Sequence, residues 1–577
     1  MTPNWACDTG LVGVRELELW FTGVGMVTLE NRGRTQTAST DGESEVLVTP
    51  PSDDEVYWYF GPQLRWVQVL LLVAFILAAW SLLQFSLSRV ELLWFMLVVL
   101  GLNVVGNLLS VATSFNTRRY SAASHRALVD GWQPKGPVPS IDVYLPTYGE
   151  DLAVLNNTYT YVAAMEWSGD VNVYVLDDGA RDSVRDLAAS FGFRYIVRPN
   201  RGHMKKAGNL QYAFTRTSGD HIVILDADFC PRADFLKHLV PYMDDPTVGI
   251  VQSPQFFDTT EDQNWIQRTA GVTQELFYRW ILPSRDRFDA AVCVGTCAIY
   301  RREALAAAGG FAQIEHSEDI HTGLHLMRAG YQTRYVPVIV SRGLCPPDLA
   351  GFLNQQYRWC NGSLVRLDNE HLRDVELKMT LRQRVCFWAG VLYYITTAVN
   401  VVALFIPGLI MAAFFPDQVH PLQFVPFLVG LWVYLVVLPF VSKGRWRFEV
   451  LRIQMAYSYA HIVAIVHKLR GRSAGWVPTG AVGATNTLAR SIARLGAVAI
   501  VMSLVPFWAV VIYDIHTYGL LRFWLMAMFL GLYTYLAAPL LMEFLKVLYP
   551  RKQKTATDPP GARNRHRRTR RRELVSA

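Results

Sequence analysis

The main pattern along the sequence is a series of apolar runs, each about as long as a bilayer is thick. Residues 64–113 contain two such runs, residues 384–441 contain two more, and residues 495–547 contain the last two. A run of about 20 apolar residues can cross the hydrocarbon layer as a helix. The pattern therefore predicts six membrane-spanning helices in three pairs.

Between the first and second pairs, the pattern changes to short β-branched stretches separated by longer helical ones. Apolar stretches at 141–145, 171–176 and 221–225 alternate with helical segments such as 182–191. This alternation is typical of a parallel βαβ sheet, which binds ligands at the carboxyl ends of its strands. We therefore predict a cytosolic α/β domain with a parallel-rich sheet over residues 117–380, inserted between the membrane helices.

The other segments are amphipathic or polar. Residues 348–364 and 443–490 mix apolar, basic and aromatic positions, which favours interfacial helices along the membrane surface. Residues 1–60 have a Ser/Thr/Glu/Asp-rich middle that cannot bury a core, which predicts a mobile cytosolic extension. Residues 551–577 form a basic tail, which we expect to lie against anionic headgroups in the cytosol rather than on nucleic acid.

Composition and charge agree with a membrane location. Of the 577 residues, 51% are hydrophobic and only 18% are charged, which is too apolar for soluble domains alone. Arg118 and Arg119 follow the second predicted span, so the positive-inside rule puts the α/β domain in the cytoplasm. We expect a multi-pass protein of the cell membrane (inner or plasma) with both termini cytoplasmic. The seven cysteines include no Cys-x-x-Cys pair and favour neither disulfides nor a zinc site.

Acidic residues follow two of the predicted strands. Asp177 and Asp178 end one strand, and Asp226 and Asp228 follow another. Because the carboxyl ends of parallel strands meet at one edge, these carboxylates should share a rim. An Asp-x-Asp pair suits a hard divalent cation, Mg²⁺ or Mn²⁺, that also binds phosphate oxygens and stabilises a diphosphate leaving group. Surface turns also often carry Asp-x-Asp. It is therefore the position at a strand end, rather than the motif alone, that favours a metal site.

Ser317, Glu318 and Asp319 open a predicted helix. Their structural interpretation is an N-cap, with Ser317 as the cap and the two carboxylates complementing the helix dipole. Their functional interpretation is a general base that removes a proton from an acceptor hydroxyl while a diphosphate leaves from the opposite face. The two interpretations are compatible because a cap would fix the carboxylate, and we favour Asp319 as the base.

Two further segments carry groups that suit a nucleotide sugar. Residues 203–209 place Lys206 just before a helix and a small-residue turn, although a solvated basic turn would look similar. Arg358, in a segment that also holds Gln355, can bind phosphate oxygens through its planar guanidinium. Trp359 offers an apolar face on which a sugar ring can stack. The alternative is that Arg358 and Trp359 anchor an interfacial helix to headgroups.

Taken in order, these motifs resemble the processive family 2 glycosyltransferases, and bacterial cellulose synthase catalytic subunits more closely than hyaluronan or chitin synthases. The segments that carry the resemblance are 146–150 (Pro-Thr-Tyr-Gly-Glu), 177–179 (Asp-Asp-Gly), 206–209 (Lys-Ala-Gly-Asn), 226–228 (Asp-Ala-Asp), 317–319 (Ser-Glu-Asp) and 355–359 (Gln-Gln-Tyr-Arg-Trp). The resemblance implies a GT-A type domain joined to a transmembrane channel that secretes the polymer as it grows.

The resemblance also implies roles for individual residues. Substrate would be bound by Thr147, Tyr148, Glu150, Asp177, Asp178, Lys206, Asp226, Gln355, Arg358 and Trp359. Asp226 and Asp228 would hold Mg²⁺ or Mn²⁺, and Asp319 would be the catalytic base. The Phe-Cys-Gly-Ser acceptor motif of the family stands here as residues 293–296 (Cys-Val-Gly-Thr), and its gating loop is approximated by residues 476–480, without the lysine.

The motifs and the resemblance together predict a membrane-integrated inverting hexosyltransferase that polymerises a UDP-sugar into a secreted β-linked polysaccharide, and the resemblance alone makes UDP-glucose the first choice of donor. The alternatives are a UDP-N-acetylglucosamine donor or a lipid acceptor. The expected partners are the UDP-sugar, the growing polysaccharide, the bilayer and an accessory export subunit, but no nucleic acid. A transporter or scaffold with an inactive nucleotide-binding domain is disfavoured, because the predicted spans contain few ionisable residues.

Overall fold

A computed structural model describes most of the chain. The described residues are 47–61, 65–114, 118–257, 259–260, 263–364, 379–441, 448–472, 474 and 486–550. Among the described residues, those from Pro50 on belong to one compact unit. Most of the predicted N-terminal extension, the predicted loop at 476–480 and the basic tail at 551–577 lie outside the described residues.

A seven-stranded sheet forms the centre of the α/β domain, in the order β3-β2-β1-β4-β8-β6-β9. Its strands are β1 (Ile141–Thr147), β2 (Val171–Asp177), β3 (Arg194–Ile196), β4 (His221–Ile224), β6 (Val248–Gln252), β8 (Ala298–Arg301) and β9 (Gln332–Tyr335). Strands β1 to β4 run parallel and β9 runs parallel to β6, whereas β8 is antiparallel to both of its neighbours. The sheet is therefore mixed and parallel-rich, which confirms the predicted parallel-rich sheet, and β8 is the antiparallel strand within it.

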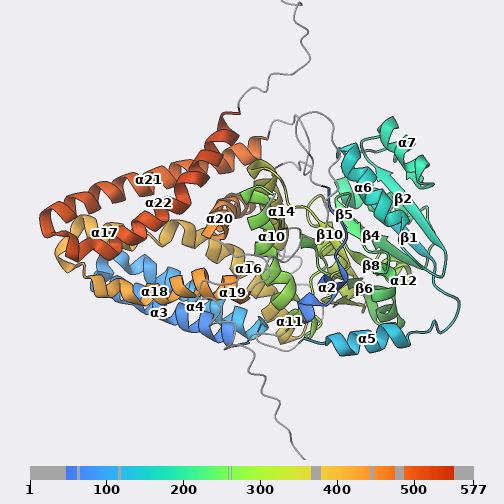
Figure 1. Ribbon diagram of the computed structural model, residues 1–577, viewed down its shortest axis with the longest axis horizontal. Helices are drawn as coiled ribbons and strands as arrows, with labels where there is room; N and C mark the ends of the chain where they lie inside the picture. The colour runs from blue at the N-terminus through green and yellow to red at the C-terminus, as the bar shows by residue number, and fades with distance from the viewer. Residues whose placement is uncertain are drawn as a thin grey trace, which may run out of the picture. The chain divides into compact units, whose positions relative to one another are not determined.

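Helices cover both faces of this sheet (Figure 1). One face packs against α6 (Leu152–Ala163) and α7 (Asp182–Ser190), and the other against α8 (Lys205–Phe214), α12 (Arg302–Ala307) and α13 (Glu318–Arg328). Burial on both faces explains why the strands read as continuous apolar runs. A second sheet, in the order β5-β10-β7, joins β5 (Phe229–Pro231), β10 (Ser341–Gly343) and β7 (Phe256–Phe257).

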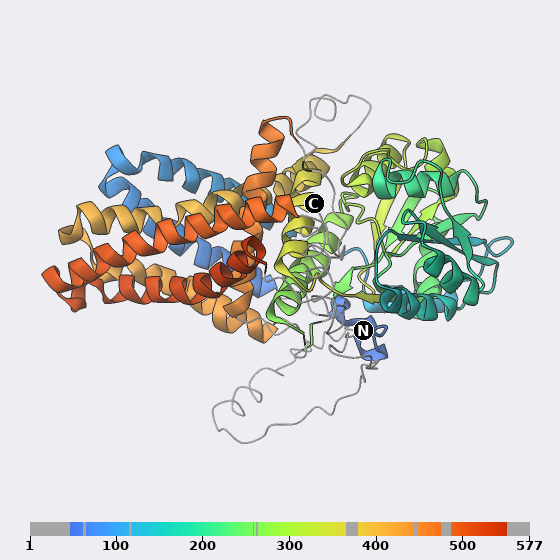
Figure 2. The same ribbon diagram turned by 90° about the horizontal axis from the view of Figure 1, so that it is seen from above.

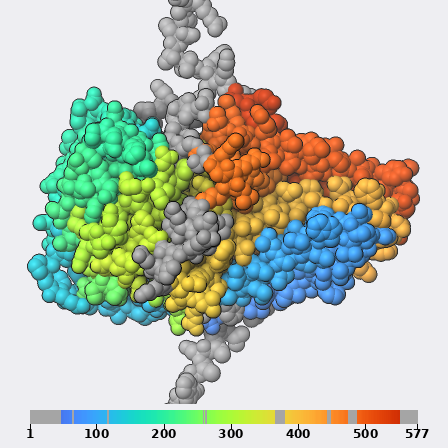
Figure 3. Space-filling view, turned by 180° about the vertical axis from the view of Figure 1, so that it is seen from behind, coloured from blue at the N-terminus to red at the C-terminus, as the bar shows by residue number. Residues whose placement is uncertain are grey.

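Within the described residues, six helices are long and apolar enough to cross a membrane. They are α3 (Arg65–Ser88), α4 (Val90–Ser114), Leu381–Phe414, Pro421–Val441, α21 (Thr487–Tyr518) and α22 (Leu520–Leu548). The third consists of α16 (Leu381–Ala403) and α17 (Ile406–Phe414), and the fourth contains α18 (Val425–Trp432). Helix α21 lies along α22 in two views (Figure 1 and Figure 2), and the surface of α3 and α4 adjoins that of residues 381–441 (Figure 3). These helices and the sheet confirm an α/β domain inserted between six candidate spans.

Three more helices join the sheet to these long helices. They are α10 (Trp265–Leu276), α14 (Leu349–Leu364) and α20 (Phe448–Leu469). Helix α20 packs against α10, α14 and α16, and Arg268 of α10 binds Glu449 of α20 at 2.7 Å. Helices α14 and α20 occupy the two segments predicted to be interfacial. Their position on a membrane surface stays a prediction.

Helix α20 also compensates for a proline in α22. Pro539 cannot donate an N–H group to the carbonyl of Tyr535, four residues earlier. The buried Arg452 of α20 donates from Nη2 to that carbonyl at 3.4 Å and from Nε to the carbonyl of Leu536 at 3.2 Å. Its guanidinium lies 5.2 Å from the ring of Trp265, which adds a cation–π contact.

The end of the predicted mobile extension is packed. Helix α2 (Asp53–Val56) follows Ser52, whose N–H donates to Glu55 Oε2 at 2.9 Å. Glu55 also forms an ion pair with Arg342, and the carbonyl of Val56 accepts from the N–H of Ile339 at 2.9 Å. The prediction of a mobile segment therefore does not hold for residues 50–60, because the apolar side chains after the polar stretch enter the core.

Candidate active site

The carboxyl ends of β1, β2 and β4 meet at one edge of the sheet. Thr147 lies opposite Asp177 in the register of β1 and β2. The N–H of Leu225 donates to the carbonyl of Tyr144 at 3.2 Å, so the turn that carries Asp226 leaves the sheet beside β1. The first two acidic segments therefore lie on the same rim.

Glu150 shapes the turn after β1. Its Oε2 accepts from the Thr147 hydroxyl at 2.5 Å and from the N–H groups of Tyr148 and Gly149 at 2.8 Å and 3.1 Å. The carbonyl of Tyr148 approaches the next turn so closely that a Cβ atom on Gly179 would lie 2.3 Å from it. The side chain of Tyr148 is exposed. Glu150 and Gly179 therefore fix the backbone from which Tyr148 projects.

Asp177 is buried and shapes the turn after β2. Its Oδ1 accepts from the N–H of Gly179 at 2.7 Å. Its Oδ2 accepts from the N–H of Arg181 at 2.8 Å and from the hydroxyl of Tyr195 at 2.9 Å. The structure therefore gives Asp177 a positioning role through three donors of its own chain.

Asp178 forms a bidentate ion pair with Arg198, a residue that the sequence reasoning missed. The Nε–Oδ1 and Nη2–Oδ2 distances are 2.6 Å and 2.5 Å, and the two residues are 1% (Arg198) and 7% (Asp178) exposed. Arg198 also donates to the carbonyls of His203 at 2.5 Å and Lys205 at 3.0 Å. The pair therefore holds the turn before α8 and positions Lys206. The signal in the sequence was an arginine placed directly after a short β-branched stretch.

Lys206 connects two parts of the site. Its Nζ donates to Asp226 Oδ1 at 2.5 Å and to the carbonyl of Gly295 at 3.0 Å. The N–H of Asp226 donates to Thr296 Oγ1 at 2.8 Å, so the predicted acceptor motif lies directly against the Asp-x-Asp turn. Burial lowers the pKa of Lys206, but Asp226 and Glu318 more than offset this and hold that pKa above its ordinary value.

Four carboxylates surround this lysine and are called the acidic cluster: Asp226, Asp228, Glu318 and Asp319. Burial raises the pKa of Asp228 to about 7, with further contributions from Asp226 and Glu150. Burial and the neighbouring Glu318 likewise raise the pKa of Asp319. When all four carboxylates are ionised, the cluster carries more negative charge than Lys206 and Arg358 together balance, which favours binding of a further cation.

The donor set at Asp226 and Asp228 fits a cation that is shared with a substrate. Among the described residues, no three or more His, Cys, Asp or Glu side chains are arranged to enclose a metal ion by themselves. Hard cations such as Mg²⁺ take six oxygen ligands and often keep only one or two carboxylates, with substrate phosphates and water completing the shell. Two carboxylates therefore fit Mg²⁺ or Mn²⁺ bound together with a diphosphate.

Asp319 lies in the first turn of α13. Its Oδ1 accepts from the N–H of Ile320 at 2.8 Å, and a Cβ atom on Gly295 would lie 2.9 Å from the Cβ of Asp319. Ser317 occupies the N-cap position, but in the described structure its side chain makes no capping bond, so that part of the N-cap interpretation is wrong. The reason is its left-handed backbone, φ 58°, because capping side chains reach the helix from extended backbone.

Helix α14 brings Arg358 to the acidic cluster. Burial lowers the pKa of this guanidinium, and all four carboxylates of the cluster oppose that shift. Helix α14 can approach α13 because Gly362 has no side chain, since a Cβ atom there would lie 1.5 Å from the Oγ of Ser317. Gln355 and Trp359 are half-buried on the same helix, and in the described part of the chain neither donates a hydrogen bond to the cluster.

We expect Gly362→Ala to lower the rate of the sugar transfer that the sequence predicts by roughly 10- to 100-fold, since displacing a group that positions substrate by about 1 Å has such effects. The new methyl group would overlap the Ser317 side chain and push Arg358 away from the cluster. Gly351→Ala on the same helix is the control, because its Cβ would come no closer than 3.2 Å to another atom, the Cβ of Pro346, with the Asp348 carboxylate next at 3.6 Å. Equal initial rates of nucleotide release from the two variants would contradict this packing argument.

Comparison with known proteins shows which proteins the domain is similar to. Residues 221–441 match the family model described as glycosyl transferase family group 2. Cellulose synthase 1 catalytic subunit of Komagataeibacter xylinus is 33% identical over 327 residues, which cover 54% of this chain and 42% of the relative. The cellulose synthase catalytic subunit of Pseudomonas fluorescens is 36% identical over 263 residues, covering 44% of this chain and 35% of the relative. The chain spans less than half the length of these relatives.

Among solved structures, a mannosyltransferase from Pyrobaculum calidifontis in complex with GDP-Man and Mn²⁺ aligns with 64% of this chain and 100% of its own, at 19% identity and a TM-score of 0.41. The residues of the acidic cluster all fall within 221–441, so the cluster lies in the part of the chain that is similar to this class of glycosyltransferases. Within that class, the chain resembles bacterial cellulose synthase catalytic subunits.

Proposed function

We propose that the chain is an inverting hexosyltransferase of the membrane that polymerises a UDP-sugar into a secreted β-linked polysaccharide, with UDP-glucose as the first-choice donor. The observation that carries this proposal is the acidic cluster on one rim of the sheet, beside Lys206 and Arg358. The relatives are named as UDP-forming cellulose synthases, which supports a uridine nucleotide and a glucan product. The alternatives are UDP-N-acetylglucosamine as donor and a lipid as acceptor.

In this proposal Asp319 accepts the proton of the acceptor hydroxyl. Its raised pKa makes the carboxylate a stronger base than an exposed one, and its bond to the N–H of Ile320 fixes its direction. The hydroxyl oxygen attacks the anomeric carbon on the face opposite the diphosphate, so the bond to the diphosphate breaks and the anomeric configuration inverts.

The cationic residues act on the leaving group. Arg358 would bind two phosphate oxygens, and Lys206 would turn from Asp226 to the diphosphate as its charge develops. Asp226 and Asp228 would hold Mg²⁺ or Mn²⁺, which supplies Lewis-acid stabilisation of the diphosphate when bound. Tyr148 would face the uridine.

We further propose that the α/β domain and both termini lie in the cytoplasm, at the inner or plasma membrane. Arg118 and Arg119 directly follow α4, which supports this orientation by the positive-inside rule. The nucleotide donor would then be used where it is made, and the product would leave through the membrane helices, with or without an accessory export subunit.

Release of UDP by the purified protein in lipid nanodiscs tests the function. UDP-glucose and UDP-N-acetylglucosamine are supplied separately, each with Mg²⁺ and with Mn²⁺, and the product is digested with linkage-specific glycanases. We expect release from UDP-glucose that depends on the metal and yields a digestible polymer. Release from UDP-N-acetylglucosamine alone would identify that nucleotide sugar as the donor in place of UDP-glucose. No release from either nucleotide sugar would contradict the proposal.

We expect the rate of UDP release to fall as the pH drops below neutrality. Asp319 must be ionised to accept a proton, and its raised pKa means that it becomes protonated at a higher pH than an ordinary carboxyl, about 4. Rates at saturating donor, measured in overlapping buffers from about pH 5 to 9, would locate the acidic limb. A rate that stays constant down to pH 5 would exclude this assignment.

A further inference from the structure

Gln252 is a buried amide that the proposed mechanism does not use. It is the last residue of β6 and is 0% exposed. Its Oε1 accepts from the N–H of Val294 at 3.0 Å, and its Nε2 donates to the carbonyl of Val292 at 2.6 Å. Gln255 adds a third bond, from its Nε2 to the carbonyl of Val294 at 3.0 Å. Two side-chain amides therefore hold a short stretch of backbone that lies outside the strands.

The bonded stretch belongs to the segment between α11 (Leu282–Asp286) and β8, residues 287–297, which is called the β8 loop. The main chain of Gln252 is fixed on both sides, because it pairs with Ala298 of β8 and with Tyr335 of β9. The amide therefore reaches the β8 loop from a rigid position in the interior of the sheet.

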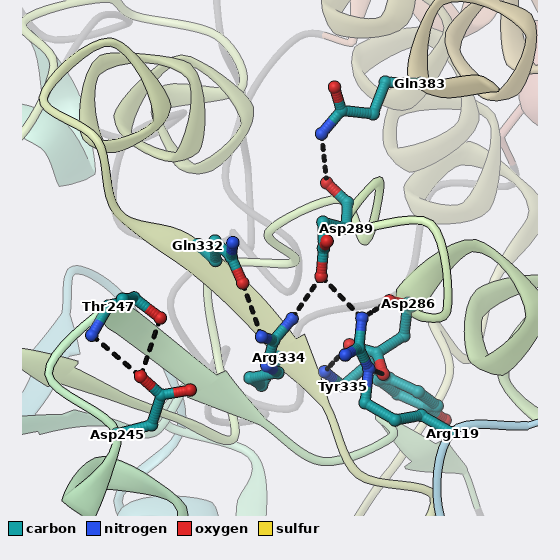
Figure 4. A network of polar contacts seen from close by, with 9 residues as sticks. All are labelled: Arg119, Asp245, Thr247, Asp286, Asp289, Gln332, Arg334, Tyr335 and Gln383. Atoms are coloured by element: carbon teal, nitrogen blue, oxygen red, sulfur yellow. Dashed lines mark hydrogen bonds and ion pairs between the residues drawn. The ribbon is translucent and has the colours of Figure 1, made fainter. Parts of the chain in front are cut away.

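The start of the β8 loop is held by a second network of polar contacts (Figure 4). Asp286 accepts from Arg119 Nε at 3.1 Å and from the N–H of Tyr335 at 2.8 Å. Asp289 accepts from Arg119 Nη2 and from Arg334 Nη1, both at 2.5 Å. Arg334 and Tyr335 belong to β9, the strand beside β6. The loop is therefore fixed at its start to β9 and, through its later residues, to β6.

The residues that follow Val294 contact the acidic cluster and its lysine. The carbonyl of Gly295 accepts from Lys206 Nζ at 3.0 Å, and the Oγ1 of Thr296 accepts from the N–H of Asp226 at 2.8 Å. Both contacts come directly after the N–H group that the buried amide holds. A shift of this stretch would therefore move the groups that hold Lys206 and Asp226.

We propose that Gln252 is a positioning residue, which sets the places of Lys206 and Asp226 through the β8 loop without touching the substrate. This inference rests on the proposed glycosyl transfer for its effect on the rate, whereas the hydrogen bonds exist without a substrate. Lys206 would act on the diphosphate as its charge develops, so a displaced Lys206 lowers kcat and leaves the KM of the donor unchanged. Methionine is the informative replacement, because its unbranched side chain neither donates to the carbonyl of Val292 nor accepts well from the N–H of Val294.

Kinetics and amide hydrogen exchange of Gln252→Met in lipid nanodiscs test the inference. We expect kcat for UDP release to fall by at least roughly 10-fold, with the KM of the nucleotide sugar unchanged, as for other misplaced groups. The amides of residues 292–297 and 226–229 should both exchange faster, by roughly 2- to 10-fold, the effect of one lost hydrogen bond. Trp167→Phe is the control, because it removes the bond from Nε1 to the carbonyl of Pro139 at 2.9 Å, before the start of β1. It should change neither kcat nor the exchange of these two segments.

Each outcome supports or overturns the inference. A lower kcat together with faster exchange in both segments supports it. A folded Gln252→Met that keeps its kcat, or whose residues 226–229 exchange at the unmodified rate, would overturn it and leave the proposed transferase intact. If the unmodified protein releases no UDP, the proposed function fails, and the exchange of residues 226–229 alone decides whether Gln252 positions Asp226. If Gln252→Met does not fold, as judged by gel filtration, Gln255→Met carries the test with the same expected directions, because it removes the third bond to the same stretch.

Discussion

Asp319→Asn is expected to lower the rate of UDP release by roughly 10²- to 10⁴-fold, the usual contribution of a general base. The asparagine side chain has nearly the same size and can still accept the hydrogen bond from the N–H of Ile320, so α13 should still begin at the same residue. Its amide cannot accept the proton of the acceptor hydroxyl. Single-turnover UDP release, measured together with the affinity for UDP, separates a chemical defect from a binding defect.

Glu315→Gln is the matched control, because Glu315 is exposed and precedes the same helix. It removes one carboxylate from the same loop and should leave the rate close to that of the unmodified protein. If Asp319→Asn kept most of its activity, Asp319 would not be the base, and Glu318 would be the next candidate within the acidic cluster.

Asp178→Asn is expected to lower the free energy of unfolding of the α/β domain by about 3–5 kcal/mol. The substitution leaves the guanidinium of Arg198 buried without its counter-charge, which costs far more than the loss of a surface ion pair. Denaturant unfolding in nanodiscs, followed by the fluorescence of the domain, measures the change.

Asp186→Asn is the control for this prediction, since Asp186 pairs with Arg185 on the exposed surface of α7 at 3.5 Å. Exposed pairs of this kind contribute about 0–1 kcal/mol. The resemblance assigns Asp178 to substrate binding, and the experiment separates the two roles. Unchanged stability with weaker donor binding would favour the ligand role over the structural one.

Much of the fold could be predicted because its signals are local. Apolar runs of membrane length predict spans by themselves, and strands buried on both faces read as apolar stretches that end in Asp177 or precede Asp226. The direction of β8 could not be predicted in this way, because the four residues of Ala298–Arg301 pack apolar side chains whichever way the strand runs. Strand direction depends on how the preceding chain returns to the sheet.

The composition of the site was partly predictable, but the contacts within it were not. The motifs named Asp178 and Lys206 as substrate ligands, whereas the structure pairs them with Arg198 and Asp226, each 20 residues away in sequence. Such pairs depend on how two loops meet, which no local pattern encodes.

The bonds from Arg452 to helix α22 have a mechanical consequence. Rotation of α22 about its own axis would break the bonds from Arg452 to the carbonyls of both Tyr535 and Leu536. Because Arg452 is buried, water does not readily replace these bonds. The last membrane helix and α20 must therefore turn together. Helix α20 also packs against α14, which carries Arg358. A tilt of α20 and α22 together would therefore shift Arg358 relative to the acidic cluster.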